Sequence, residues 1–380
     1  MNRPHPQPLS LRERGVSNSL SFRKSWVRAV QLLFFSCLLA IPSRGIELGG
    51  YYENNILMVT KRDWGAAAGD LNQLRLKIDS KITSELNLHL EPRYYYLAKS
   101  GELPLSGTTG LDQLVWDRVY LNYHSALLSL TLGKQRIAWG TGYIWNPTDI
   151  FNPFVLSFAV REEEESNSQA VRLQVPIGTA GGIDGYVQTD KAWDQTKKGI
   201  RAKTNYGLFD LSLSYVDLGE GGFQIGLDTA GELWQRGVRS EIALRSPAGA
   251  NSYIQSVWGW DYTLDNGIGL NMEYYFNGPG KKNKDDYDIN HLGMDYLFFS
   301  ANKILDELTE VRGSVIMNLD DMGFILYPQY LRNIRQNLDL ALEAMLVGGQ
   351  EGSEFKPSYQ LDPTGLLGGN ILFIKFIYNF

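Results

Sequence analysis

The chain has 380 residues, of which 43% are hydrophobic and 21% are charged, and its formal net charge is −6. Its mean hydropathy of −0.23 excludes a protein that crosses a membrane as a bundle of apolar helices. The acidic balance argues against binding to nucleic acid. Aromatic residues make up 12% of the chain, and Tyr and Trp favour membrane interfaces. The composition suits a soluble enzyme or a transmembrane β-barrel, and the aromatic content favours the barrel.

Residues 1–45 are predicted to be an N-terminal extension and a cleaved signal peptide. An apolar stretch over 27–41, too short to span a bilayer as a helix, follows basic residues and precedes small ones, which places cleavage after Gly45. The Pro-rich, basic segment before Phe22 resembles a translated intergenic segment and takes no part in the fold. The only cysteine, Cys37, lies inside the signal. The mature chain is therefore expected to hold no disulfide, no Cys-ligated zinc and no c-type haem.

From Ile46 onward, short segments of alternating apolar and polar residues recur, and no helical run of ordinary length interrupts them. In a soluble sandwich the apolar face would meet a protein core, whereas in a membrane barrel it meets lipid and the polar face lines water. Two-sided alternation alone does not separate these folds. The connections do, because tight turns alternate with longer polar segments, as short periplasmic turns alternate with long external loops in outer-membrane barrels. The longer segments are 98–111, 137–167, 277–288 and 348–369.

The sequence thus predicts an all-β fold, a transmembrane antiparallel up-and-down β-barrel that forms one domain over residues 46–380. About 18 strands of ~10 residues are expected, and an even number places both termini on one side of the membrane. The segment 223–231 alternates least clearly, and its loss together with a neighbour would give about 16 strands. A barrel of this width has an aqueous lumen, which loops must narrow because no segment is long enough to be a plug domain. The predicted strands cover 46–59, 70–82, 85–97, 112–124, 127–136, 167–177, 181–190, 198–206, 209–217, 223–231, 234–245, 251–264, 268–276, 289–303, 310–319, 322–332, 336–347 and 370–380.

The longest break in the alternation, residues 133–165, contains the sequence GKQRIAWGTGYIWNPTDIFNPF. Its WGxGxxWNPTDxFNP segment resembles a signature of porin-like Gram-negative outer-membrane β-barrels that have no firmly assigned substrate. The likeness extends more loosely over most of the mature chain, and it implies a barrel with a porin-like role. The residues that carry it are Gly133, Arg136, Trp139, Gly140, Gly142, Trp145, Asn146, Pro147, Asp149, Phe151, Asn152 and Pro153.

The same segment is predicted to form a compact loop, because its glycines permit positive φ and its two Asn-Pro pairs cannot continue a sheet ladder. Its large aromatic side chains need burial, and the inner barrel wall offers it at least cost, which would place the 137–167 loop in the lumen as a constriction. An external cap packed on itself is the alternative. The predicted constriction residues are Trp139, Trp145, Asp149, Arg161, Glu162, Glu163, Glu164 and Glu165.

The acidic run Glu162 to Glu165 is expected to face a set of basic side chains on inward positions of the barrel wall. Acid and base opposed across a narrow pore would produce a transverse field that favours polar or charged solutes. A solvated external acidic loop, with divalent cations held between lipopolysaccharide phosphates, is the alternative. The predicted pore-wall residues are Arg75, Lys77, Lys81, Arg93, Arg118, Arg172 and Arg201.

The C-terminal segment 370–380 carries an apolar side chain on every second position and ends on the chain terminus. Period-two alternation places these side chains on one face of a strand. A terminal strand that ends on an aromatic residue resembles the closing strand of outer-membrane barrels, whose insertion machinery reads this signature. The residues that form it here are Phe376, Tyr378 and Phe380.

Enzyme chemistry finds little support in the mature sequence. His89, His124 and His291 lie on separate predicted strands, and no P-loop, dinucleotide-binding fingerprint or metal-ligand spacing is present. The leading hypothesis is a passive channel for small polar or charged solutes that needs no cofactor or metal. A structural sheath around a periplasmic partner such as an electron-transfer cytochrome is the alternative, and a barrel hydrolase ranks third. Expected partners are outer-membrane lipid, lipopolysaccharide, the barrel-assembly machinery, small solutes and, as one option, further copies of the chain.

Overall fold

The computed structural model describes residues 45–60, 66–100, 112–151, 168–189, 191–287, 292–357 and 368–380. The predicted signal segment and the run from Arg161 to Glu165 lie outside these residues. Within them, no helix is both long and apolar enough to cross a membrane. The strands are β1 (Ile46–Thr60), β2 (Ala66–Lys81), β3 (Leu86–Ser100), β4 (Asp112–His124), β5 (Ser129–Gln135), β6 (Ser168–Ile177), β7 (Gly181–Gln188), β8 (Lys198–Tyr206), β9 (Phe209–Asp217), β10 (Phe223–Leu233), β11 (Arg236–Ser246), β12 (Tyr253–Thr263), β13 (Ile268–Asn277), β14 (Asp295–Asp306), β15 (Thr309–Asn318), β16 (Phe324–Arg335), β17 (Leu338–Gly348) and β18 (Asn370–Asn379), with two 3-10 turns, η2 (Gly219–Gly221) and η3 (Lys284–Asp286).

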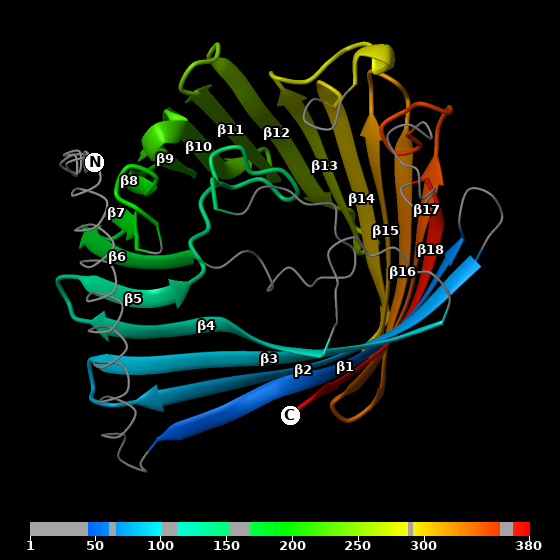
Figure 1. Ribbon diagram of the computed structural model, residues 1–380, viewed down its shortest axis with the longest axis horizontal. Helices are drawn as coiled ribbons and strands as arrows, with labels where there is room; N and C mark the ends of the chain where they lie inside the picture. The colour runs from blue at the N-terminus through cyan, green and yellow to red at the C-terminus, as the bar shows by residue number, and fades with distance from the viewer. Residues whose placement is uncertain are drawn as a thin grey trace, which may run out of the picture.

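The strands form one antiparallel 18-stranded sheet that closes on itself (Figure 1). Each strand pairs with its neighbours in the sequence, and β1 pairs with both β2 and β18. At this seam the Gly50 amide donates to the Phe380 carbonyl at 3.0 Å, and the Phe380 amide donates to the Gly50 carbonyl at 3.1 Å. Closure leaves no unpaired sheet edge, which is the condition for a sheet to cross a bilayer. The prediction of an 18-stranded up-and-down barrel is confirmed, and it includes the doubtful segment after Phe223, which forms β10.

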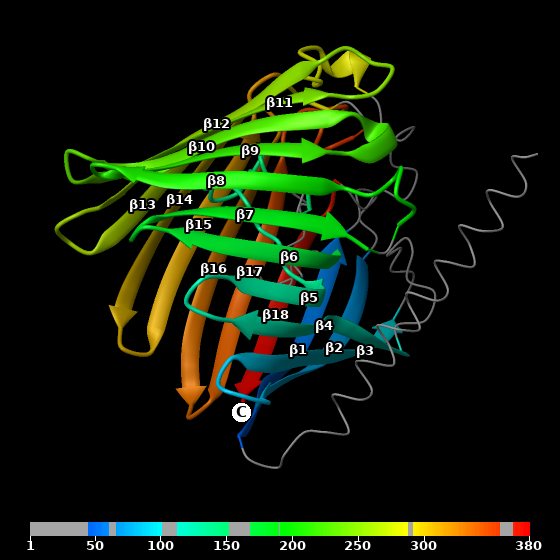
Figure 2. The same cartoon turned by 90° about the vertical axis from the view of Figure 1, so that its left-hand side faces the viewer.

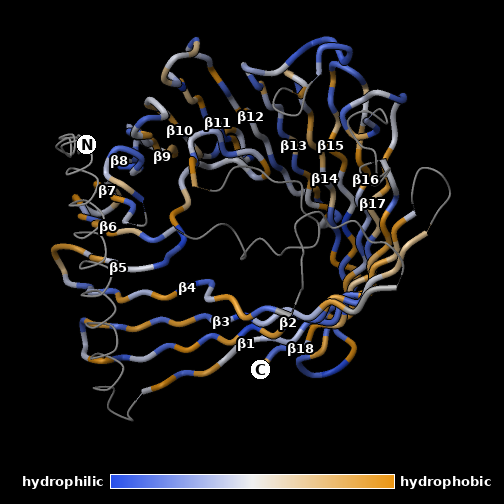
Figure 3. The backbone as a smooth tube through the Cα atoms, viewed as in Figure 1, coloured by the Kyte–Doolittle hydropathy of each residue, from blue (hydrophilic) through white to orange (hydrophobic). Residues whose placement is uncertain are grey.

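The C-terminal strand illustrates how alternation sorts side chains between the two faces of the wall. Leu372, Phe376 and Tyr378 are exposed on the outside, whereas Phe373 and Lys375 are buried inside the barrel. The hydropathy-coloured tube alternates in the same way along many strands (Figure 3). An apolar belt on the outside of a closed cylinder is the reverse of a soluble sandwich, where the apolar face would be covered.

The outer face also carries a polar cluster on β1 and β2. The Asn54 side-chain amide donates to Asp70 at 2.5 Å and to Asn72 at 3.1 Å, and the Tyr52 hydroxyl donates to Asn72 at 2.5 Å. These groups satisfy one another, which lowers the cost of placing them on an apolar surface.

The two ends of the barrel differ in their connections. One end, called the turn end, joins consecutive strands by turns such as 207–208, 234–235 and 336–337, and the opposite end, called the loop end, carries longer segments (Figure 2). Trp234, Gln235 and Asn337 adopt positive φ, as the tightest hairpins require. Because the strand number is even, Ile46 and Phe380 both lie at the turn end.

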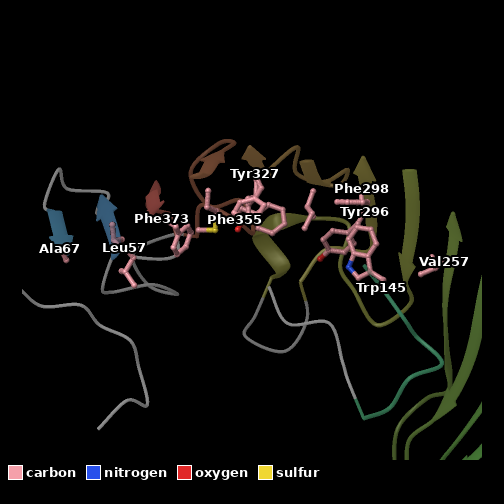
Figure 4. Packing of buried hydrophobic residues seen from close by; sticks show 13 residues of the cluster. Leu57, Ala67, Trp145, Val257, Tyr296, Phe298, Tyr327, Phe355 and Phe373 are labelled. Carbon is pink, nitrogen blue, oxygen red and sulfur yellow. The ribbon is translucent and has the colours of Figure 1, made fainter. Parts of the chain in front are cut away.

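Inside the loop-end half, an apolar row follows the wall from β1 and β2 through β18 back to β12 (Figure 4). Phe373, Tyr327 and Phe298 belong to this row, and Trp145 and Phe355 join it from two of the long connections. The barrel interior is therefore packed by loop residues on this side.

Candidate functional site

The connection between β5 and β6 supplies the candidate site. Residues 136–151 leave β5 and run inside the barrel, visible in Figure 1 as the teal trace just inside the wall formed by β6 to β12. Hydrogen bonds join this segment, called the inner loop, to inward side chains of β7, β10, β11 and β13. The remaining residues of the predicted constriction, 152–167, lie outside the described part of the chain.

Glu241 on β11 holds the inner loop through its carboxylate. Oε1 accepts the backbone amides of Thr141 and Gly142 at 2.5 and 2.6 Å. Oε2 accepts the backbone amide of Thr148 at 3.1 Å and its hydroxyl at 2.7 Å. Glu241 is fully buried, and burying a carboxylate costs several kcal/mol unless hydrogen bonds compensate it. Four donors from the inner loop supply that compensation. The buried carboxylate of Glu241 and the conformation of the loop therefore stabilise each other.

Glu273 on β13 makes a second anchor of the same kind. Its Oε1 accepts the Tyr143 amide, and its Oε2 accepts the Ile144 amide at 2.9 Å. Arg239 of β11 holds this carboxylate in place, because its Nε donates to Glu273 at 2.9 Å while its remaining nitrogens bond Asp261 and Asn271. The two wall glutamates, Glu241 and Glu273, thus bind consecutive stretches of the same backbone.

Close approach of the loop to the wall explains Gly140, and close approach of the loop to itself explains Gly142. A Cβ on Gly140, whose φ is +99°, would lie 2.7 Å from a carboxylate oxygen of Glu241. A Cβ on Gly142 would lie 1.9 Å from the carbonyl oxygen of Trp145. A larger residue at either position would shift the backbone and disturb the bonds that the Thr141 and Gly142 amides donate to Glu241.

Asp149 stabilises the inner loop from within. Its Oδ2 accepts the Trp139 amide at 3.1 Å, and its Oδ1 accepts the Phe151 amide at 2.9 Å. These bonds bring both aromatic rings against Tyr186 of β7, with ring centroids 5.0 and 4.5 Å apart. The Trp139 indole donates to Asp184 at 3.1 Å. The first aromatic anchor of the loop is therefore on the β6 to β9 side of the lumen.

The second aromatic anchor lies on the opposite side of the two wall glutamates. Trp145 stacks on Tyr275 of β13 with centroids 5.2 Å apart, and Tyr143 stacks on Phe298 of β14 at 5.6 Å. Gln224 of β10 donates to the carbonyls of Pro147 and Thr148, which fixes the turn between the two anchors. The loop accordingly spans the inner wall from β7 to β14.

The predicted pore-wall residues on β2 to β8 share one inward face, and most are paired with acids of these strands or of β10. Arg75 bonds Glu91 at 2.5 Å, and Arg93 bonds Asp117 at 2.7 Å. A bulge at Glu91 and Pro92 turns both Asp117 and Arg118 towards the interior. The further pairs on this wall are Arg118 with Glu91 at 3.8 Å, Arg172 with Asp184 at 2.5 Å and Arg201 with Asp228 at 2.8 Å.

The other predicted wall residues and the histidines are placed as follows. Lys77 shares the inward face of β2, whereas Lys81 lies at the turn end, 3.5 Å from Glu47. His89 lies inside between two carboxylates, and His124 is exposed where β4 ends. His291 lies outside the described residues. Lys77 and His89 therefore belong to the charged inner wall, whereas Lys81 and His124 lie at its turn-end margin.

Sequence reasoning missed the wall acids that organise this site. Nothing in the alternation pattern distinguishes Glu241 or Glu273 from an ordinary lumen-facing carboxylate. The available signal was the loop itself, because a glycine-rich segment with several unpaired amides needs acceptors. Those acceptors lie about 100 residues further along the chain, as the separations of 99 and 130 residues in these bonds show.

No protein-family model matches the sequence, and no curated protein matches it significantly. Solved structures do match. A structure described as "Asymmetric conductivity of engineered proteins" has a TM-score of 0.50 at 12% identity, over 88% of this chain and 100% of the other. A mutant of Rhodopseudomonas blastica porin gives the same identity, coverage and TM-score.

At 12% identity these matches establish the fold alone. The closed 18-stranded sheet and its apolar exterior define the chain as an antiparallel β-barrel, the fold that it shares with these structures. The narrower resemblance carried by Trp139, Trp145 and Asp149 stays a prediction.

Proposed function

We propose that the chain is a porin-like channel of the Gram-negative outer membrane through which small polar or charged solutes diffuse passively. The apolar outer belt supports this placement, because hydrocarbon is the environment in which exposed Leu, Ile and Phe side chains are stable. In this proposal residues 1–45 direct export, the turn end faces the periplasm and the loop end faces the exterior. Lipid and lipopolysaccharide contact the outer surface, and the assembly machinery reads Phe376, Tyr378 and Phe380. The chain acts without a cofactor and is not an enzyme.

The observation that carries the proposal is the attachment of the inner loop to Glu241 and Glu273. A barrel of 18 strands encloses more space than its inward side chains fill. A loop fixed along the inner wall by backbone hydrogen bonds reduces that space. We infer that the 137–167 loop narrows the channel, with Trp139, Trp145 and Asp149 holding it in position and Arg161 and Glu162 to Glu165 contributing charge at the constriction.

The charged wall on β2 to β8 supports passage of polar rather than apolar solutes. Arg75, Arg93 and Arg201 are buried and paired with acids of β3, β4 and β10. Paired charges of this kind still present strong local dipoles to water and to a passing solute. The field predicted between this wall and Glu162 to Glu165 would add to these local pairs.

Planar-bilayer recording of the purified, refolded protein tests the proposal. Discrete current steps of uniform size are expected, and protein that has been heat-denatured in detergent serves as the matched control. Membrane fractionation of cells that express the full chain should recover it with the outer membrane. A folded barrel that produces no current steps would contradict the channel, and recovery in the soluble fraction would contradict the location.

A further inference from the structure

A recess of about 430 Å³ opens from the inner wall on the turn-end side of the inner loop. Strands β2 to β6 form its walls, and Arg136, the first residue of the inner loop, borders it on the loop side. The recess is separate from the two wall glutamates, which lie on β11 and β13. Arg172 links the recess to the first aromatic anchor, because it lines the recess and also bonds Asp184, the acceptor of the Trp139 indole.

The side chains that line this recess carry more positive than negative charge. Among the described residues, four lining side chains are Lys or Arg and two are Asp or Glu. Lys81 lies 3.5 Å from Glu47, and both are at the rim. The four basic residues are Lys81, Arg118, Arg136 and Arg172, and the two acidic residues are Glu47 and Asp79.

A buried carboxylate behind the recess holds its basic groups in place. Glu91 Oε2 bonds Arg75 at 2.5 Å, and its Oε1 lies 2.8 Å from His89 Nε2 and 3.8 Å from Arg118. His89 Nδ1 lies 2.6 Å from Asp79. Both ring nitrogens of His89 therefore face acceptors, a geometry that fits the imidazolium, which donates from both. Glu91 is therefore a positioning residue, because one of its carboxylate oxygens contacts both the Arg118 guanidinium and the His89 imidazole.

The remaining lining is rich in groups that bond hydroxyls. The Asn122 side chain donates to Thr131 at 2.8 Å, and both residues line the recess. Tyr120 stacks on His89 with ring centroids 4.7 Å apart and closes one side. Guanidinium groups recognise carboxylates, whereas amide and hydroxyl side chains recognise sugar-like hydroxyl groups.

We propose that this recess binds small hydroxylated organic acids, with Arg118 and Arg136 contacting the carboxylate and the Asn122 side of the recess contacting the hydroxyls. The inference rests on the proposed channel function, to which it adds a class of solute. A binding site between the constriction and the turn end raises the local concentration of such a solute on its path. Weak binding, in the millimolar range, suits passage because a tightly bound solute would block the channel.

Calorimetry on the purified barrel in detergent tests the binding without any need for current. Gluconate is the probe, and glucose is its neutral counterpart with similar hydroxyls and no carboxylate. Gluconate should bind at least about tenfold more tightly than glucose, because a hydrogen-bonded charge pair supplies the difference. The substitutions Arg118→Gln and Arg136→Gln should each weaken gluconate binding by about tenfold and leave glucose unchanged.

Arg312→Gln is the matched control, since Arg312 also faces the lumen but lies on β15 and pairs with Glu310 at 2.7 Å. It removes the same charge from the lumen without touching the recess. Equal loss of gluconate binding in all three variants would show a general effect of lumen charge and overturn the site. So would equal affinity for gluconate and glucose, or no binding of gluconate at all. A barrel that binds gluconate but passes no current would retain the site and refute the channel.

Discussion

Replacing Glu241 with Gln tests whether the wall carboxylate holds the inner loop. The Gln carbonyl can still accept the amides of Thr141 and Gly142, but the side-chain NH₂ cannot accept the amide and hydroxyl of Thr148. The substitution keeps the shape of the side chain and the packing around it. The Thr148 hydroxyl can rotate to accept a hydrogen bond from this NH₂, but the buried Thr148 amide loses its acceptor.

The expected size of the effect follows from the bond of the Thr148 amide. A hydrogen bond to a charged acceptor contributes about 1.5 to 3 kcal/mol, so its loss costs about 1.5 to 3 kcal/mol, and the remaining bonds weaken because their acceptor is no longer charged. The smaller cost of burying a neutral amide offsets part of this. A net loss of about 2 kcal/mol would lower the ratio of attached to detached loop about 30-fold. The second anchor at Glu273 remains, so the barrel itself should fold normally.

Hydrogen exchange followed by mass spectrometry measures the attachment directly. Amides in a peptide spanning 140–148 should exchange about 30-fold faster in Glu241→Gln than in the natural chain, and single-channel recordings should show larger current fluctuations. Glu310→Gln is the control, because Glu310 also faces the lumen but bonds Asn302 and Arg312. Unchanged exchange in Glu241→Gln, or an equal change in both variants, would refute the role assigned to Glu241.

Three further outcomes are expected. Gly142→Ala should detach the same loop segment, because its Cβ would meet the Trp145 carbonyl oxygen, whereas Gly313→Ala, where a Cβ meets open space, should leave its hydrogen exchange unchanged. Deleting Phe380 removes two backbone bonds at the seam and should lower the fraction of barrel that migrates as folded on unheated gels, and a full yield would contradict this. Burial raises the pKa of Glu354, in the connection between β17 and β18, above its ordinary 4.5. The folded state then binds this proton more tightly than the unfolded chain, so its contribution to stability is greatest below pH 4.5 and falls as pH rises through the raised pKa. In detergent, the Tm of Glu354→Gln should fall less than that of the natural chain as pH rises above 4.5. An equal fall in both proteins would contradict the raised pKa of Glu354.

The strands could be predicted because the alternation of apolar and polar residues along the sequence determines where each strand lies. A side chain on every second position must match either lipid or the interior, and this repeats along β18 from Leu372 to Tyr378. Even β10, where Gly226 and Gly231 weaken the pattern, pairs along its length with β9 and β11. Hydrogen bonds to these two neighbouring strands stabilise β10, although its own sequence predicts a strand only weakly.

The interior was less predictable because it depends on contacts between distant segments. Alternation placed Arg75 and Arg201 on the inward face, but it did not show that Glu91 and Asp228 would pair with them. The bulge that turns Asp117 inward has no clear signal in the residue pattern. Register between strands and the path of the inner loop decide these pairs, and a single sequence specifies neither.

Glu241 and Glu273 hold the inner loop mainly by its main chain, while the Thr141 hydroxyl adds a bond of 3.4 Å to the Thr229 carbonyl and Ile144 packs against the apolar row. A replacement at Thr141 therefore costs one long hydrogen bond, whereas a replacement at Ile144 must stay apolar to keep its packing. The barrel is therefore a scaffold in which Gly140, Gly142 and the two acids hold the loop. A side chain of the loop that makes few other contacts, such as Thr141, can be changed to alter the width of the lumen.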